Sequence, residues 1–140
     1  MNDDQHRYLN QVCDRPGMFV GSSEFDRVCA YIDGLHAATG CLTGFREWLV
    51  VEIGTGNNLA WIGLVRQIIH RDSTPVDDRV AKLGQLLNDF HEYAGSTIGA
   101  TTGLMRVYLR YHGWLLQQKW YKPDWIGYVP PYDKQPENAG

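Results

Sequence analysis

Apolar side chains recur every third or fourth residue along most of this chain, which is the spacing of one buried face of an α-helix. The clearest repeat joins Phe25, Val28, Cys29 and Ile32. We therefore expect an all-α protein, a compact bundle of about five helices. The pattern predicts a short helix over residues 3–13 and further helices over residues 23–40, 44–53, 58–70, 75–95 and 102–120.

Capping and turn residues mark the ends of these segments. Ser23, Asn57 and Thr74 each precede an apolar repeat, and their side-chain oxygens can accept hydrogen bonds from the first free N–H groups of a helix. Gly40 and Gly95 follow the last apolar residue of a repeat, where glycine is typical of a helix end. These five positions set the predicted boundaries.

Two segments fit more than one conformation. Residues 44–53 suit a helical face, but residues 48–51 could equally form a buried strand, and we favour the helix. Residues 15–21 read RPGMFVG, in which the proline and the glycines favour turns. The apolar middle of this segment could be a short strand or a buried connector, and we expect Met18 and Phe19 to enter the core.

No repeat and no linker divides the chain, so we predict one helical domain over residues 1–132. From Tyr121 onward, prolines occur among aromatic residues, a composition that favours an extended conformation over a helix. Residues 133–140 are predicted to form a flexible C-terminal tail. The ring-rich segment either covers the bundle or contacts a partner, because Trp and Tyr are favoured anchors of protein interfaces.

The composition narrows the functional class. The formal net charge is −3, so the chain lacks the basic surface that nucleic acids and anionic membranes attract, and we expect neither as a partner. Three cysteines are an odd number without CxxC spacing, which favours the reducing cytoplasm over a disulfide framework. The acidic N-terminus is not typical of a signal peptide, and no run of about 18 apolar residues predicts a membrane span.

No arrangement of reactive residues in the sequence points to catalysis. The histidines lie outside HxxxH and HExxH spacing, so no metal site is predicted. Residues 54–56 read Gly-Thr-Gly but continue with asparagines, where a phosphate-binding loop requires Lys-Ser or Lys-Thr. Cys29 belongs to an apolar helix face, where a thiol is an ordinary small hydrophobic group. We therefore predict no catalytic residue, no cofactor and no metal.

Residues 15–21 resemble the RPGMYIG segment of the ATPase subunits of type II topoisomerases and their relatives, where the segment also precedes a helix. That resemblance implies an acid and an asparagine on the following helix, and glycine-rich nucleotide loops after it. Here residues 25–34 read FDRVCAYIDG, without a Glu followed by an Asp-Asn pair. We therefore interpret the segment as a structural reversal of the chain and not as part of a nucleotide site.

Three motifs support a second resemblance: RPGMFVG at residues 15–21, GFREWLV at residues 44–50 and NNLAW at residues 57–61. Together they resemble a family of small bacterial single-domain proteins of unassigned activity. In size and mild acidity the chain is also similar to the immunity proteins encoded beside polymorphic toxins. The resemblance implies inhibition by binding, and it assigns no functional residue to this chain.

We predict that the protein acts by binding, as an immunity-type inhibitor that occludes the active site of a cognate bacterial toxin. Charge complementarity would speed its association with a basic partner. The candidate contact residues are acidic side chains, a neighbouring arginine and the aromatic residues of the C-terminal segment: Arg46, Glu47, Glu52, Asp77, Asp78, Asp89, Glu92, Trp120, Tyr121, Trp125 and Tyr128.

Two alternatives stay open. A small enzyme or small-ligand-binding protein would have a pocket between helices, with His36, Arg46 and Asn58 as polar groups. A structural subunit of a larger assembly would show a broad exposed apolar face. A filled core with an acidic or aromatic outer patch would favour the inhibitor.

Overall fold

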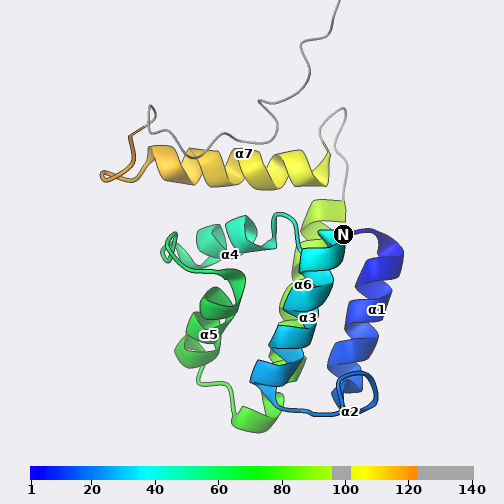
Figure 1. The fold of residues 1–140 in the computed structure, drawn as a ribbon. Helices are drawn as coiled ribbons and strands as arrows, with labels where there is room; N and C mark the ends of the chain where they lie inside the picture. The colour runs from blue at the N-terminus through cyan, green and yellow to red at the C-terminus, as the bar shows by residue number, and fades with distance from the viewer. Residues whose placement is uncertain (96–101, 123–140) are drawn as a thin grey trace, which may run out of the picture.

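The computed structural model describes residues 1–95 and 102–122, and the regular structure in that part of the chain is entirely helical (Figure 1). This confirms the all-α prediction. The predicted boundary at residue 132 and the tail over residues 133–140 lie outside the described residues. The elements in chain order are α1 (Asp3–Asp14), α2 (Pro16–Phe19), α3 (Phe25–Thr39), α4 (Phe45–Ile53), α5 (Trp61–Arg71), the 3-10 helix η1 (Val76–Asp78), α6 (Arg79–Gly95) and α7 (Gly103–Leu116).

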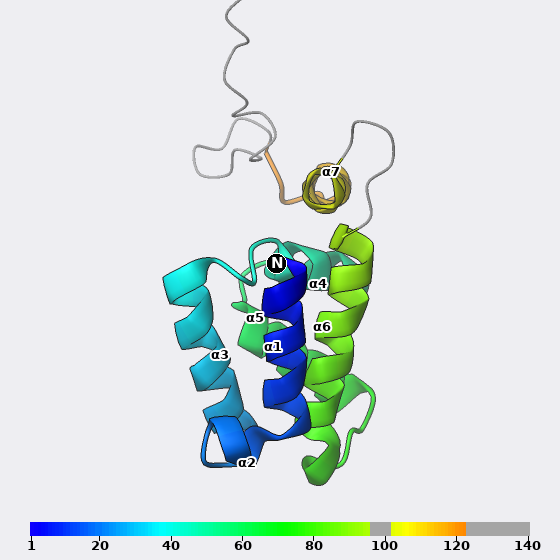
Figure 2. The ribbon, with the colours of Figure 1, turned by 90° about the vertical axis from the view of Figure 1, so that its right-hand side faces the viewer.

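The helices pack around α6. Figures 1 and 2 show α1, α3 and α6 upright beside one another, with α7 lying across the top of the bundle. Helix α6 contacts α1, α3, α4, α5 and α7, and α4 contacts both α5 and α7. Among the described helices, none has both the length and the apolar character needed to cross a membrane.

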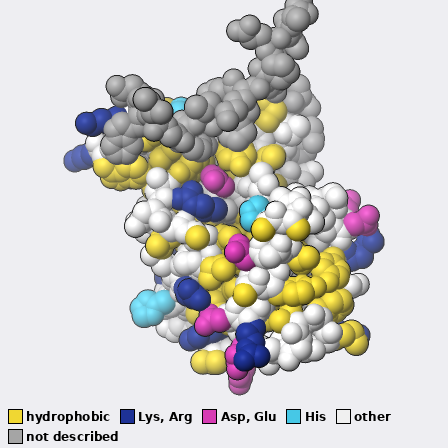
Figure 3. Space-filling view, in the orientation of Figure 1, with side chains coloured by type: hydrophobic (Ala, Val, Ile, Leu, Met, Phe, Trp, Pro, Cys, Tyr) yellow, Lys and Arg dark blue, Asp and Glu magenta, His cyan; other side chains and the backbone are white. Residues whose placement is uncertain are grey.

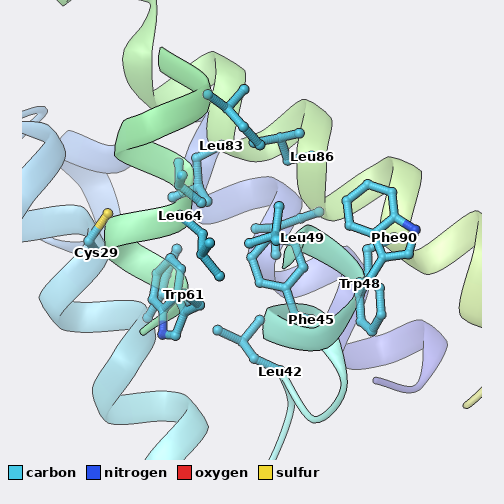
Figure 4. Close-up of a cluster of buried hydrophobic side chains, with 14 of the residues drawn as sticks. Cys29, Leu42, Phe45, Trp48, Leu49, Trp61, Leu64, Leu83, Leu86 and Phe90 are labelled. Carbon is cyan, nitrogen blue, oxygen red and sulfur yellow. The ribbon is translucent and has the colours of Figure 1, made fainter. Parts of the chain in front are cut away.

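Phe45, the first residue of α4, lies in the middle of the hydrophobic core (Figure 4). Its ring is fully buried, and its centroid lies 5.4 Å from that of Phe90, 6.0 Å from that of Trp61 and 6.3 Å from that of Trp48. Aromatic pairs at these separations attract each other in addition to the free energy gained by burial. Because the rings come from α4, α5 and α6, this cluster fixes the three helices relative to one another.

The surface seen in Figure 3 mixes charged and apolar side chains, and yellow hydrophobic groups gather below α7 and near α1 and α3. Besides Met18 and Val76, the large apolar side chains with substantial exposure among the described residues lie on α7 or just after it, namely Leu104, Leu109, Leu116 and Trp120. Helix α7 therefore buries one side on α4 and α6 and exposes apolar groups on another.

The helix predicted over residues 44–53 is confirmed as α4, but three predicted helix caps are wrong. α3 begins two residues after Ser23 and α5 begins four residues after Asn57, and neither side chain caps its helix. Asn57 instead accepts a hydrogen bond from the hydroxyl of Tyr111. Thr74 precedes the 3-10 helix η1, and α6 begins only at Arg79. Tertiary contacts and helix-end geometry therefore outweigh these local capping signals.

The segment between α1 and α3 also differs from the prediction. Residues 16–19 form the single helical turn α2. Met18 is 72% exposed, so the prediction that it enters the core is wrong, whereas Phe19 is partly buried with its ring edge-on to Tyr8 at 5.5 Å. Adjacent residues of a helical turn point about 100° apart, so one of the two can face the core while the other faces solvent.

The end of α5 has a serine where helices usually have a glycine. The N–H of Ser73 donates to the carbonyl of His70 at 3.2 Å, and the N–H of Thr74 donates to the carbonyl of Ile69 at 3.0 Å. These are the two bonds of a Schellman motif. Ser73 has a φ of 51°, and within the described residues it is the one non-glycine residue with a positive φ. For a residue with a side chain this conformation is unfavourable by about 1–2 kcal/mol.

We expect Ser73→Gly to raise the free energy of unfolding by about 0.5–1 kcal/mol, because glycine adopts the left-handed conformation without steric strain. Urea unfolding of the two proteins measures the difference. Ser23→Gly is the matched control, since Ser23 is exposed without a positive φ, and it should not stabilise the protein. A Ser73→Gly variant less stable than the wild type would contradict the prediction.

Candidate functional site

A groove between α4, α5 and α6 brings together three of the predicted contact residues. Glu52 of α4 and Asp89 and Glu92 of α6 line this groove, whose volume is about 620 Å³. The other lining residues are two cations and four apolar or aromatic side chains: Arg71, Lys82, Trp48, Ile68, Leu86 and Tyr93. We call this feature the acidic groove.

The three carboxylates of the acidic groove differ in their pairing. Glu52 accepts a hydrogen bond from Nη2 of Arg110 on α7 at 2.8 Å. Asp89 and Glu92 are exposed, and neither forms an ion pair within residues 1–95 and 102–122. They are three positions apart on α6, so they lie on the same side of the helix. The carboxylates of Asp89 and Glu92 are thus neighbouring negative charges, and neither is paired with a cation among the described residues.

The two cations of the acidic groove are occupied by another carboxylate. Nε of Arg71 and Nζ of Lys82 lie 2.9 Å and 3.0 Å from the two carboxylate oxygens of Asp72. The hydrogen bond from Arg71, followed by that from Lys82, lowers the pKa of Asp72 to about 2. Because Asp72 is ionised at neutral pH, it neutralises one of the two cations, and the groove keeps an excess of negative charge.

Aromatic and aliphatic side chains form the apolar part of the groove. Trp48 is almost fully buried, with its ring centroid 5.9 Å from that of Phe90. The ring of Tyr93 is covered by two arginines of α7, with Cζ of Arg106 at 4.6 Å and Cζ of Arg110 at 5.5 Å from its centroid. The groove is therefore attached to the core and to α7, and its shape is set by rigid helices. Chemically, it suits a cationic group attached to an apolar stem.

Arg46 and Glu47 lie on α4 but do not line the acidic groove. Nε of Arg46 donates to the carbonyl of Leu59 at 2.7 Å, and its Nη2 donates to the carbonyl of Asn57. Oε1 of Glu47 lies 3.7 Å from Nη1 of Arg46, and both side chains are mostly buried. The guanidinium therefore holds the turn between α4 and α5, and it has little surface left for a partner.

Asp77 and Asp78 also lie away from the acidic groove. Both are exposed on η1, and Asp78 precedes Asp89 by 11 residues. That separation corresponds to roughly 16 Å along a helix axis. The acidic residues of the prediction therefore divide into a group in the groove and a pair beside the start of α6.

Of the aromatic candidates, Trp120 lines a smaller hollow of about 330 Å³ beside the turn that follows α4. The rings of Trp114 and Trp120 meet edge to face there, 6.1 Å apart. Its lining consists of residues 54–58, Trp114, Gln118 and Trp120. None of these residues lines the acidic groove, so the structure does not bring Trp120 to the carboxylates.

Tyr121 follows Trp120 but does not line this hollow. Tyr121 is partly buried, with its ring at 90° to that of Trp120 and 6.4 Å from it. Trp125 and Tyr128 lie outside the described residues.

Of the polar groups proposed for an enzyme, Asn58 alone lines either of the two hollows described above. Nδ1 of His36 accepts a hydrogen bond from the N–H of Leu42 at 3.1 Å. Asn58 lines the smaller hollow, in the turn between α4 and α5 to which Arg46 is bonded. No group of three or more His, Cys, Asp or Glu side chains among the described residues could hold a metal ion.

The buried cysteines are poor nucleophiles. Burial raises the pKa values of the Cys13 and Cys29 thiols to about 12, so both stay protonated at neutral pH. A protonated thiol is far less reactive than a thiolate. These two residues therefore behave as the small hydrophobic groups that the sequence predicted for Cys29.

Sequence reasoning missed the Arg71–Asp72–Lys82 link and the floor formed by Trp48 and Tyr93. Lys82 lies ten residues after Asp72, beyond a change of chain direction, so their pairing depends on how α5 packs on α6. One feature of the sequence does indicate the two unpaired carboxylates of the acidic groove. Asp89 and Glu92 stand on the same side of a predicted helix without a basic residue three or four positions away to pair with either of them.

Comparisons with known proteins identify no relative, since no family model, no curated protein and no solved structure matches this chain. The resemblance to immunity proteins therefore stays a prediction.

We expect Asp72→Asn to change how stability depends on acid pH. The carboxyl has its pKa lowered from 3.8 to about 2 in the folded protein, so its ionised form stabilises the fold. That stabilisation is fully present above about pH 4 and is lost as the pH falls toward 2. The difference in urea midpoint between the wild type and Asp72→Asn should therefore be constant near neutral pH and shrink below pH 4. An equal difference at pH 2 and pH 7 would contradict this.

We expect Arg46→Met to lower the free energy of unfolding by about 2–3 kcal/mol, because the carbonyls of Asn57 and Leu59 would lose their charged donor. Chemical denaturation measures this loss. Arg27→Met is the control, since Arg27 pairs with Glu24 on the surface and its loss should change stability by less than about 0.5 kcal/mol. Equal effects of the two changes would show that Arg46 does not hold the turn.

Proposed function

We propose that this protein binds another protein and serves as an immunity-type inhibitor of a cognate bacterial toxin. The observation that supports this proposal is the pair of carboxylates of Asp89 and Glu92, which are exposed beside an aromatic floor and have no ion pair within the described residues. The partner would present a basic side chain or a basic segment to the acidic groove. The expected cytoplasmic location and the absence of a cofactor belong to the same proposal.

The composition of the acidic groove favours a protein partner. Charged groups around an apolar floor resemble the polar rim and aromatic centre of a protein interface. An arginine of the partner could form two parallel hydrogen bonds with one carboxylate while its stem covers Trp48 or Leu86. The groove is open and its two cations are already bonded to Asp72, so an incoming cation would not have to displace them.

The charge pattern of the acidic groove supports the proposal of inhibition. An enzyme that acts on an anionic substrate such as a nucleic acid needs a basic cleft. A protein that offers fixed carboxylates to such a cleft competes with the substrate for the same cations. Complementary charge also speeds the association of the two proteins and disfavours partners of the wrong sign.

The two carboxylates lower the stability of the helix that carries them. Like charges three residues apart on a helix repel each other, and the last turn of α6 has no basic residue to offset Glu92. Residues that reduce stability without an internal role are typical of binding surfaces. This physical conflict supports a role for Asp89 and Glu92 outside the fold.

The smaller hollow supports the alternative function, the binding of a small ligand. Indole rings of Trp114 and Trp120 stand opposite a glycine-bearing turn with amide side chains. This uncharged lining would suit a neutral ligand with a flat apolar face. Its volume of about 330 Å³ lies at the lower end of the range for ligand pockets.

We expect the double variant Asp89→Asn, Glu92→Gln to bind the toxin encoded beside this protein at least about tenfold more weakly, while its own stability rises by about 0.2–0.5 kcal/mol. Calorimetric titration measures the affinity, and growth of cells that express both proteins measures protection. The matched control is Asp77→Asn, Asp78→Asn, which removes the same charge from η1. Equal loss of binding in both variants, or unchanged binding in the first, would contradict the assignment of the groove.

A further inference from the structure

A hollow of the opposite charge lies where α3 begins, α5 ends and α6 begins, at the lower end of the molecule in Figure 1. Its volume is about 550 Å³, and Phe25 and Ile69 form its apolar walls. Its polar lining consists of three basic side chains, two hydroxyls and one carboxylate: Arg66, His70, Arg79, Ser73, Thr74 and Asp26. We call it the cationic hollow. Figure 3 shows basic and acidic side chains close together in this lower part of the surface.

Arg79 is the unusual member of this hollow. It is half-buried, and its Nε is fully buried without a hydrogen-bond partner in the described structure. Its guanidinium also forms no ion pair with any of the described carboxylates. Each of the other arginines has an ion pair or stacks on an aromatic ring. A buried charged donor without an acceptor is unfavourable, so a group that accepts its hydrogen bonds would stabilise this arrangement.

Arg66 stands in the same hollow with most of its donors unused. Its Nη2 donates to Oδ1 of Asp26 at 2.9 Å. A guanidinium has five N–H donors, and this bond uses one of them. The two arginines contribute +2 and Asp26 contributes −1, so the formal charges of these three groups sum to +1. This local sign is opposite to the net charge of the whole chain.

Ser73 and Thr74 add two hydroxyl groups to the lining. Their backbone N–H groups are bonded to the carbonyls at the end of α5, while neither hydroxyl forms a hydrogen bond within the described residues. Ser73 keeps its side chain although its φ of 51° favours glycine. Strain of this kind concentrates at binding sites, where the side chain is needed for another purpose.

We propose that the cationic hollow binds a phosphate group, carried either by inorganic phosphate or by a small phosphomonoester. Two guanidiniums, an imidazole and two hydroxyls offer more donors than the two oxygens of a carboxylate can accept, whereas a phosphate has three or four oxygens and a charge of about −1.5 to −2. The apolar walls of Phe25 and Ile69 could hold the body of an ester. This site shares no residue with the acidic groove and does not depend on the toxin proposal.

Titration of the full chain with inorganic phosphate at constant ionic strength tests the proposal, with binding followed by calorimetry or NMR. We expect saturable binding that Arg79→Gln weakens at least about tenfold, since a charge-assisted pair is lost. Arg27→Gln is the matched control, because it removes the same charge from a surface pair outside the hollow. A parallel titration with phenyl phosphate distinguishes the sources. Tighter binding of phenyl phosphate indicates an ester, and equal binding indicates the free ion.

Ser73→Gly separates binding from folding. It should bind phosphate several-fold more weakly while it unfolds at a higher urea concentration than the wild type. The thermal midpoint of Arg79→Gln without phosphate should equal or exceed that of the wild type, so lost binding cannot be assigned to misfolding. Wild-type protein that shows no saturation up to about 10 mM phosphate would overturn the proposal. Equal weakening by Arg79→Gln and Arg27→Gln would overturn it as well.

Discussion

The hydrogen bonds from Arg46 to the turn between α4 and α5 are the interaction on which the arrangement of this molecule depends. The carbonyls of Asn57 and Leu59 lie outside any helix, and the guanidinium of Arg46 in the first turn of α4 supplies their donors. The hydroxyl of Tyr111 on α7 bonds to the side chain of the same Asn57. One turn thus joins three helices by polar contacts, while Phe45 joins α4 to α5 and α6 by apolar ones. The acidic groove has its shape because α4 and α5 cannot move apart.

The helices were predictable from the sequence because burial of one face leaves a period of three or four residues in the order of apolar side chains. Their first residues were less predictable. Asn57 has the chemistry of a helix cap, yet its oxygen is used by Tyr111, which lies 54 positions later in the chain. Thr74 similarly belongs to the motif that ends α5. A single sequence indicates which groups are capable of capping, but the choice between competing partners is made by tertiary packing.

The candidate site likewise combines features that the sequence predicts with features that depend on tertiary packing. Glu52, Asp89 and Glu92 were predicted as contact residues because they are acidic side chains within predicted helices. Their meeting in one groove results from the contact between α4 and α6, which no periodicity encodes. Arg46 was predicted to pair with a neighbouring helix or a partner because it points away from Phe45 and Trp48. In the structure its guanidinium donates to backbone carbonyls, and a sequence does not show which carbonyls will lie within reach of a side chain.

Helix α6 contributes residues to both the acidic groove and the cationic hollow, and it carries charges that its own dipole disfavours. A helix favours negative charge at its N-terminus and positive charge at its C-terminus. α6 instead begins with Arg79 and has Glu92 in its last turn. An anion bound beside Arg79 and a cation bound beside Asp89 and Glu92 would each offset an unfavourable interaction between these charges and the helix dipole. Ten residues separate Arg79 from Asp89, or roughly 15 Å, which exceeds the Debye length of about 8 Å at physiological salt. The start and the end of α6 can therefore bind an anion and a cation independently. The proposed anion would account for Arg79, and the proposed basic partner would account for Asp89 and Glu92.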